Sequence, residues 1–190
     1  SFGCQKIITS HSDIYVNPSY IELDDSVEIC LGQSVQLNAI GNLMVYSWTP
    51  TLGLSDPNIA NPIVNTLNNT SYVVKHFDGS CIARDTVNII VYNDIPSVSF
   101  STDSLCVGDT VNFFASSGLS TNNISWEWDF GSNIQNPQYL FGVGNHLISL
   151  IVGNLDNNCY DTLVQNIMIH DLPSVDFLVD DVCLGDSVQF

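Results

Sequence analysis

Six cysteines are the residues of this sequence whose type and spacing most clearly imply chemistry. They stand at positions 4, 30, 81, 106, 159 and 183. Every second cysteine recurs at a nearly constant interval: 77 residues from 4 to 81, 78 from 81 to 159, 76 from 30 to 106 and 77 from 106 to 183. Thiols in such register predict disulfide bonds and an oxidising compartment, with reduced core cysteines as the alternative. Zinc is disfavoured, because the sequence has no Cys-x-x-Cys pair and its four histidines (11, 76, 146, 170) fit no ligand spacing.

Phrases around the cysteines repeat with the same period. "CLGQSVQL" begins at Cys30, "CVGDTVNF" at Cys106 and "CLGDSVQF" at Cys183, while "IPSVSF" at 95–100 returns as "LPSVDF" at 172–177. A fixed period of this length indicates a tandem array. We expect 1–17 to be the last strand of a preceding repeat, 18–95 and 96–172 to be whole repeats, and 173–190 to begin a following one.

Composition limits the function classes. With 3 Lys+Arg against 20 Asp+Glu, the formal charge is −17, so the surface should repel nucleic acid and anionic membranes. Hydrophobic residues make up 45%, too many for a disordered chain. No stretch is long and apolar enough to predict a membrane span.

Both whole repeats consist of short alternating runs separated by turn residues, such as "SYVVKHF" and "TVNFFAS". Rich in Val, Ile, Thr, Phe and Tyr and free of helical periodicity, they predict an all-β fold, with each repeat an antiparallel β-sandwich of about seven strands. Trp48 and Trp126 are expected on the third strand as core residues. Exposed sugar-stacking rings are the alternative for Trp48, Trp126 and Trp128.

The motif "SWEWDFGSN" at 125–133, followed by "NPQYLFGVGNHLISLIVGN" at 136–154, resembles the PKD domain family, matching its signature at Asp129, Phe130 and Gly131. The first repeat, with "YSWTPTLGLSDPNIANPIVNTLNNTSYVV" at 46–74, is similar to Ig-like repeats of large Bacteroidetes surface proteins. The resemblance implies tandem Ig-like and PKD-like sandwiches in an extended array. It also implies export by the type IX secretion route, cell-surface location, and kinship with gliding-motility adhesins and filaments.

Two disulfide schemes stay open within this fold. One pairs cysteines inside each repeat, as Cys30–Cys81 and Cys106–Cys159. In an Ig-type sandwich these lie at opposite ends of a last strand of about 27 Å, whereas a disulfide tolerates a Cα separation of only about 7 Å. The other scheme crosses the junction as Cys30–Cys159 and leaves the remaining cysteines to pair outside this sequence.

Two further kinds of site are suggested by acidic and hydroxyl residues. Carboxylates near the junction, if brought together, would suit Ca²⁺, with solvated turn residues as the alternative; they are Asp24, Asp25, Asp156 and Asp161. Asp-Ser/Thr-aliphatic triplets resemble the O-glycosylation acceptor of Bacteroidetes, with ordinary strand starts as the alternative. Their acceptor residues are Ser26, Thr86, Ser104, Thr110, Thr162 and Ser187.

No catalytic constellation is present in the sequence, so an enzyme is not expected, and no cofactor is implied beyond Ca²⁺. The sequence predicts a stalk or spacer segment of a secreted or surface-displayed bacterial adhesin or filament. A carbohydrate- or protein-binding module and an accessory region of a secreted hydrolase are the alternatives. The expected partners are neighbouring repeats of the same chain, with glycans or other surface proteins as further candidates and no nucleic acid.

Overall fold

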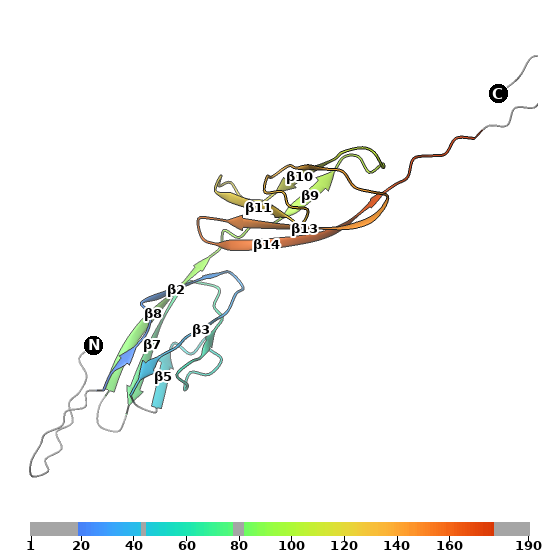
Figure 1. Ribbon diagram of the computed structural model, residues 1–190. Helices are drawn as coiled ribbons and strands as arrows, with labels where there is room; N and C mark the ends of the chain where they lie inside the picture. The colour runs from blue at the N-terminus through green and yellow to red at the C-terminus, as the bar shows by residue number, and fades with distance from the viewer. Residues whose placement is uncertain (1–18, 43–44, 78–81, 177–190) are drawn as a thin grey trace, which may run out of the picture. The chain divides into compact units, whose positions relative to one another are not determined.

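The computed structural model describes residues 19–42, 45–77 and 82–176. Within these ranges the chain forms fourteen β-strands and no helix (Figure 1). The part of the chain described therefore contains no helix that could span a membrane. Three cysteines (4, 81 and 183), Ser187 and the expected segment 1–17 lie outside the described residues.

The alternating sequence produces these strands because successive side chains of a strand point to opposite faces. In β8 (Ile82–Tyr92), Ala83, Val87, Ile89 and Val91 are buried while most residues between them are exposed. β10 (Val111–Ser116) alternates in the same way. The predicted all-β, Ig-like sandwich class is confirmed.

The described residues divide into two compact units. Unit 1 holds residues up to Pro96 together with Leu119–Ile124 and Gly153–Tyr160. Unit 2 holds Ser97–Gly118, Ser125–Val152 and the chain from Asp161 onward. Two loops of the second sequence repeat thus belong to the same compact unit as the first repeat.

Unit 1 is built around a four-stranded sheet in the order β2-β8-β7-β5. β2 (Ser26–Cys30) runs parallel to β8, whereas β7 (Thr70–Phe77) is antiparallel to both β8 and β5 (Val45–Thr49). Two short pairs complete the unit: β1 (Ile21–Glu22) with β4 (Ile40–Gly41), and β3 (Val35–Gln36) with β6 (Ile63–Val64). The core contains Ile21, Ile29, Leu37, Ala39, Trp48, Val64, Tyr72, Val74, Ala83, Val87, Ile89 and Val91.

Unit 2 contains two three-stranded sheets, β12-β10-β9 and β11-β13-β14. The first consists of β9 (Ser99–Thr102), β10 and β12 (Gln138–Tyr139), paired antiparallel. The second consists of β11 (Ile124–Trp128) and the long strands β13 (Gly144–Asn154) and β14 (Cys159–Ile169), which Figure 1 shows side by side. The residues of β11, β13 and β14 nearest the 155–158 turn belong to unit 1.

The buried tryptophans are Trp48 in the first repeat and Trp128 in the second, each 1% exposed. The expectation of Trp126 as a core residue is wrong, because this side chain is only half-buried. Alternation places Trp126 and Trp128 on the same face of β11, but Trp128 meets the aromatic core. Its ring centroid lies 5.2 Å from that of Phe100 and 4.9 Å from that of Phe113.

Candidate functional site

A disulfide joins the two sequence repeats. Cys30 and Cys159 are bonded with a Cα–Cα distance of 5.8 Å, although they are 129 residues apart. Both belong to unit 1. Of the two schemes that the sequence left open, the structure therefore has the one that crosses between repeats.

The within-repeat scheme, Cys30–Cys81 with Cys106–Cys159, is wrong. Cys159 is the first residue of β14, whereas Cys106 forms a bridge with His170, one residue beyond the last residue of that strand. A strand of this length spans roughly 36 Å at about 3.3 Å per residue, far beyond the reach of a disulfide. Cys106 is free and exposed.

The turn that carries Cys159 is tied to the linker after β8. Asn154 and Asn157 both donate side-chain N–H groups to the carbonyl oxygen of Asp94, at 2.9 and 3.0 Å. Asn154 is 3% exposed, so its side chain makes this hydrogen bond while almost completely buried from solvent. We call residues 154–159 the asparagine turn. Within unit 1, the disulfide and these two amides join this turn to residues of the first repeat.

Asp156 in the asparagine turn holds the neighbouring loop. Its carboxylate accepts hydrogen bonds from the Thr121 hydroxyl at 2.9 Å and from the Asn123 side-chain amide at 2.8 Å. These bonds, chiefly that from Asn123, lower the pKa of Asp156 because they stabilise the charged form. The backbone N–H of Leu155 also donates to the carbonyl of Asn123 at 2.9 Å.

The structure does not support the expected calcium site. Among the residues described, no group of three or more His, Cys, Asp or Glu side chains could hold a metal ion. Asp156 serves as a hydrogen-bond acceptor instead, and the carboxylate of Asp161 accepts from the backbone N–H of Val98 at 3.1 Å. Asp24 and Asp25 are exposed.

Of the hydroxyl residues expected as glycosylation acceptors, four are exposed: Ser26, Thr86, Thr110 and Thr162. Ser104 is half-buried, and its hydroxyl donates to the carboxylate of Asp109 at 2.9 Å. Ser187 lies outside the described residues. The modification itself remains a prediction.

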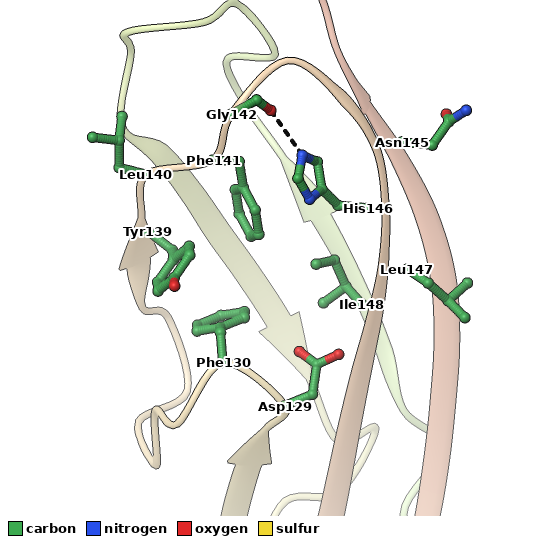
Figure 2. A pocket seen from close by; sticks show the side chains of 10 residues that line it. All are labelled: Asp129, Phe130, Tyr139, Leu140, Phe141, Gly142, Asn145, His146, Leu147 and Ile148. Atoms are coloured by element: carbon green, nitrogen blue, oxygen red, sulfur yellow. Dashed lines mark hydrogen bonds between the residues drawn. The ribbon is translucent and has the colours of Figure 1, made fainter.

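A second candidate site is a hollow of about 510 Å³ on unit 2. Figure 2 shows Phe130, Tyr139 and Phe141 turned toward one another, while Leu140 and Leu147 point away. The centroids of Phe130 and Tyr139 are 4.8 Å apart and those of Tyr139 and Phe141 are 4.7 Å apart. Tyr139 is 41% exposed, so a face of this ring cluster is available to solvent.

Polar groups at the edges of the hollow are already engaged. The Asp129 carboxylate accepts from the backbone N–H of Ser149 at 2.9 Å. A ring nitrogen of His146 lies 2.7 Å from the carbonyl oxygen of Gly142 (Figure 2). The hollow thus combines aromatic rings on which a ligand ring could stack with the hydrogen-bonded carboxylate of Asp129. It brings no nucleophile and base together for catalysis among the lining residues.

The sequence singled out Phe130 only as part of the Asp129-Phe130-Gly131 motif and did not indicate that its ring lies beside those of Tyr139 and Phe141. Sequence reasoning also missed Asn154 and Asn157. The signal was present in "NLDNNC" at 154–159, where three asparagines precede a cysteine in a turn. Side-chain amides in such turns often bond to backbone groups, although the partner, Asp94, lies too far away in the sequence to be deduced.

Comparisons with known proteins show fold-level likeness only. No protein-family model and no curated protein matches the sequence. Among solved structures, the Clostridium thermocellum CbhA fibronectin(III)-like modules are similar at 13% identity and a TM-score of 0.41, over 83% of this chain and 99% of that one. The N-terminal eight Ig domains of Down Syndrome Cell Adhesion Molecule align at 14% identity and a TM-score of 0.45, over 80% of this chain and 29% of that one. Domains 3–5 of Drosophila OTK align at 12% identity and a TM-score of 0.41, over 90% and 63%.

Proposed function

We propose that this chain is a mechanical spacer: a stalk or filament segment of a secreted or surface-displayed bacterial protein. The observation that carries this proposal is the Cys30–Cys159 bond, which encloses most of both repeats in a ring. Tension applied outside the ring passes from Cys30 to Cys159 through one covalent bond. The strands between them are then not pulled apart.

The linker supports the same role. Pro96 has a restricted φ, and the carbonyl of Asp94 is held by two asparagine amides. A net charge of −17 would keep a long polymer soluble and discourage binding to nucleic acid and anionic membranes. These features suit a segment whose partners are neighbouring repeats.

The cellular setting is part of the proposal. A disulfide between repeats is typical of proteins from oxidising compartments, which favours an extracellular location. The Asp129-Phe130-Gly131 motif and the Ig-like first repeat favour a Bacteroidetes surface protein, with PKD-type repeats, exported by the type IX route. An adhesin or gliding-motility filament would use such a segment to hold its binding end away from the cell.

Single-molecule stretching of the 190-residue chain tests the spacer function. The oxidised chain should release a contour length shorter by roughly 430–460 Å than the reduced chain, since 129 residues at about 3.3–3.6 Å each are shielded. The variant Cys30→Ser should behave as the reduced chain without reductant, and Cys106→Ser should retain the short release. Equal contour lengths before and after reduction would contradict the proposal.

The aromatic hollow favours a second candidate function, carbohydrate binding. Sugar rings stack on exposed aromatic faces, and Tyr139 presents one beside Phe130 and Phe141. Trp48 and Trp128 cannot serve, because both are buried. A glycan array should detect binding that Tyr139→Ala abolishes and that Tyr160→Ala, a change at another exposed tyrosine, leaves intact. Equal signals from the two variants would rule out this site.

A further inference from the structure

Cys106 occupies the same place in its repeat as Cys30 does in the first. The two cysteines are 76 residues apart and begin the phrases "CVGDTVNF" and "CLGQSVQL". Cys30 is bonded to Cys159, whereas Cys106 is a free, exposed thiol. The surroundings of Cys106 also match those of the bonded cysteine in several respects.

The backbone around the two cysteines is nearly the same. Beside Cys30, the N–H of Leu31 donates to the carbonyl of Tyr92 at 2.9 Å. Beside Cys106, the N–H of Val107 donates to the carbonyl of His170 at 2.8 Å. In each repeat, the cysteine therefore pairs in parallel with the end of the last strand.

The tight turn after each cysteine also matches. The carbonyl of Cys30 accepts from the N–H of Gln33 at 2.9 Å, and that of Cys106 accepts from the N–H of Asp109 at 3.3 Å. The glycine between them has a φ of 87° at Gly32 and 89° at Gly108, a left-handed conformation that side chains disfavour. The same turn thus presents the sulfur atom in both repeats.

The linker that follows is repeated as well. Asp94, whose carbonyl accepts the two asparagine amides, corresponds to Asp171, 77 residues later in "HDLPSV". Asp171 is exposed and lies one residue after His170, the bridge partner of Cys106. Counted from the paired residues Tyr92 and His170, Asp171 lies one residue earlier than Asp94. Unit 2 therefore offers the same placed cysteine, followed by a linker of similar sequence.

We propose that Cys106 forms a second disulfide, with a cysteine of the repeat that begins at about residue 173. That cysteine would stand where Cys159 stands in its own repeat, at the start of the last strand. Asparagines two and five residues before it would donate to a carbonyl of the linker after His170, as Asn157 and Asn154 do to that of Asp94. This inference does not rest on the spacer function, since a binding module could carry the same bond.

The bond forms by thiol–disulfide exchange with an oxidant that carries a disulfide. The Cys106 thiolate attacks one sulfur of the oxidant and releases the other as a thiolate. The partner cysteine, as thiolate, then attacks the Cys106 sulfur of this mixed disulfide and releases the second oxidant sulfur. Two protein thiols lose two electrons and two protons, and the oxidant disulfide gains them as two thiols.

Peptide mapping of the native polypeptide that contains this sequence tests the proposal. Free thiols are blocked with N-ethylmaleimide before unfolding, and peptic peptides are compared with and without reduction. The peptide with Cys106 should be joined to a peptide of the same polypeptide that comes from beyond residue 190. Recovery of Cys106 as the maleimide adduct, or joined to Cys4, Cys81, Cys183 or another polypeptide, would overturn it.

The 190-residue chain provides an independent measurement. Without denaturant, maleimide should label Cys106 to completion and leave Cys30 and Cys159 unlabelled until reductant is added. Cys106→Ser should lose this one adduct and keep the Cys30–Cys159 linkage. A Cys106 thiol that resists labelling in the folded chain would also overturn the proposal, because such a sulfur could not reach a partner.

Discussion

The indole N–H groups of Trp48 and Trp128 are satisfied in the same manner. Trp48 donates to the carbonyl of Ile59 at 2.8 Å, and Trp128 donates to that of Ile134 at 2.9 Å. Each tryptophan thus fixes the loop that follows its strand as well as filling the core. A buried ring that also anchors a loop should be costly to remove.

We expect Trp128→Ala to lower the free energy of unfolding by about 3–5 kcal/mol, because it leaves a cavity among aromatic rings and an unpaired Ile134 carbonyl. Trp126→Ala, two residues earlier on the same face but half-buried, should cost less than half as much. Urea unfolding followed by circular dichroism measures both. Equal losses would mean that the two rings share the core.

The carboxylate of Asp156 makes the asparagine turn sensitive to acid. Hydrogen bonds from Asn123 and Thr121 lower its pKa below the ordinary value of 3.8. A depressed folded-state pKa contributes stability that is present above the unfolded value and is lost as the pH falls through the folded value. We therefore expect the urea midpoint to decline below about pH 4, and to decline less steeply in Asp156→Asn.

Asp24→Asn is the matched control for this pH dependence, because it removes the same charge at an exposed position. Its decline should parallel that of the unaltered chain. If Asp156→Asn also parallels it, the hydrogen bonds to Asp156 do not contribute to the acid sensitivity.

Among the elements, the segment between β5 and β6 depends on a close backbone approach at Gly53. This residue has a φ of 83°, and a Cβ placed there would lie 2.6 Å from the carbonyl oxygen of Asn65 and 2.9 Å from the hydroxyl of Tyr72. The same hydroxyl donates to the carbonyl of Leu52 at 2.7 Å. The segment around Gly53 therefore packs closely against both Asn65 and Tyr72 of β7.

Gly53→Ala should destabilise the chain by roughly 3 kcal/mol or more, since it adds a clash to the strain of a positive φ. Gly108→Ala isolates the strain, because its φ is 89° and a Cβ there would meet nothing within 4 Å. We expect about 1–2 kcal/mol for this control. Thermal unfolding of both variants measures the difference. Similar melting temperatures would show that the backbone around Gly53 can move to accommodate a Cβ.

Much of this element-level structure could be predicted from the sequence, since alternation and turn residues identified the strands and the all-β class. Alternation could not distinguish Trp126 from Trp128, because both occupy one face of β11. The choice depends on Phe100 and Phe113, which reach Trp128 from another sheet. The partner of Cys30 was likewise open, because strand order decides which cysteines approach and the sequence does not state it.

For the whole molecule, the Cys30–Cys159 bond restricts the unfolded chain more than any other feature described. A closed loop of 129 residues should contribute up to about 4–5 kcal/mol by lowering the entropy of the unfolded state. We expect Cys159→Ser to lower the melting temperature, with Cys106→Ser as the control that leaves it unchanged. Calorimetry under non-reducing conditions measures both, and identical transitions in the two variants would contradict the expectation.

The same ring has a consequence for survival among proteases. Lys75 and Arg84 are the only lysine and arginine residues between Cys30 and Cys159, and they lie opposite each other in the ladder of β7 and β8. A trypsin-like enzyme that cuts once after either residue opens the ring but frees neither fragment, because the sulfur atoms still connect them. A single cut by such a protease would therefore leave the two parts of the chain covalently connected.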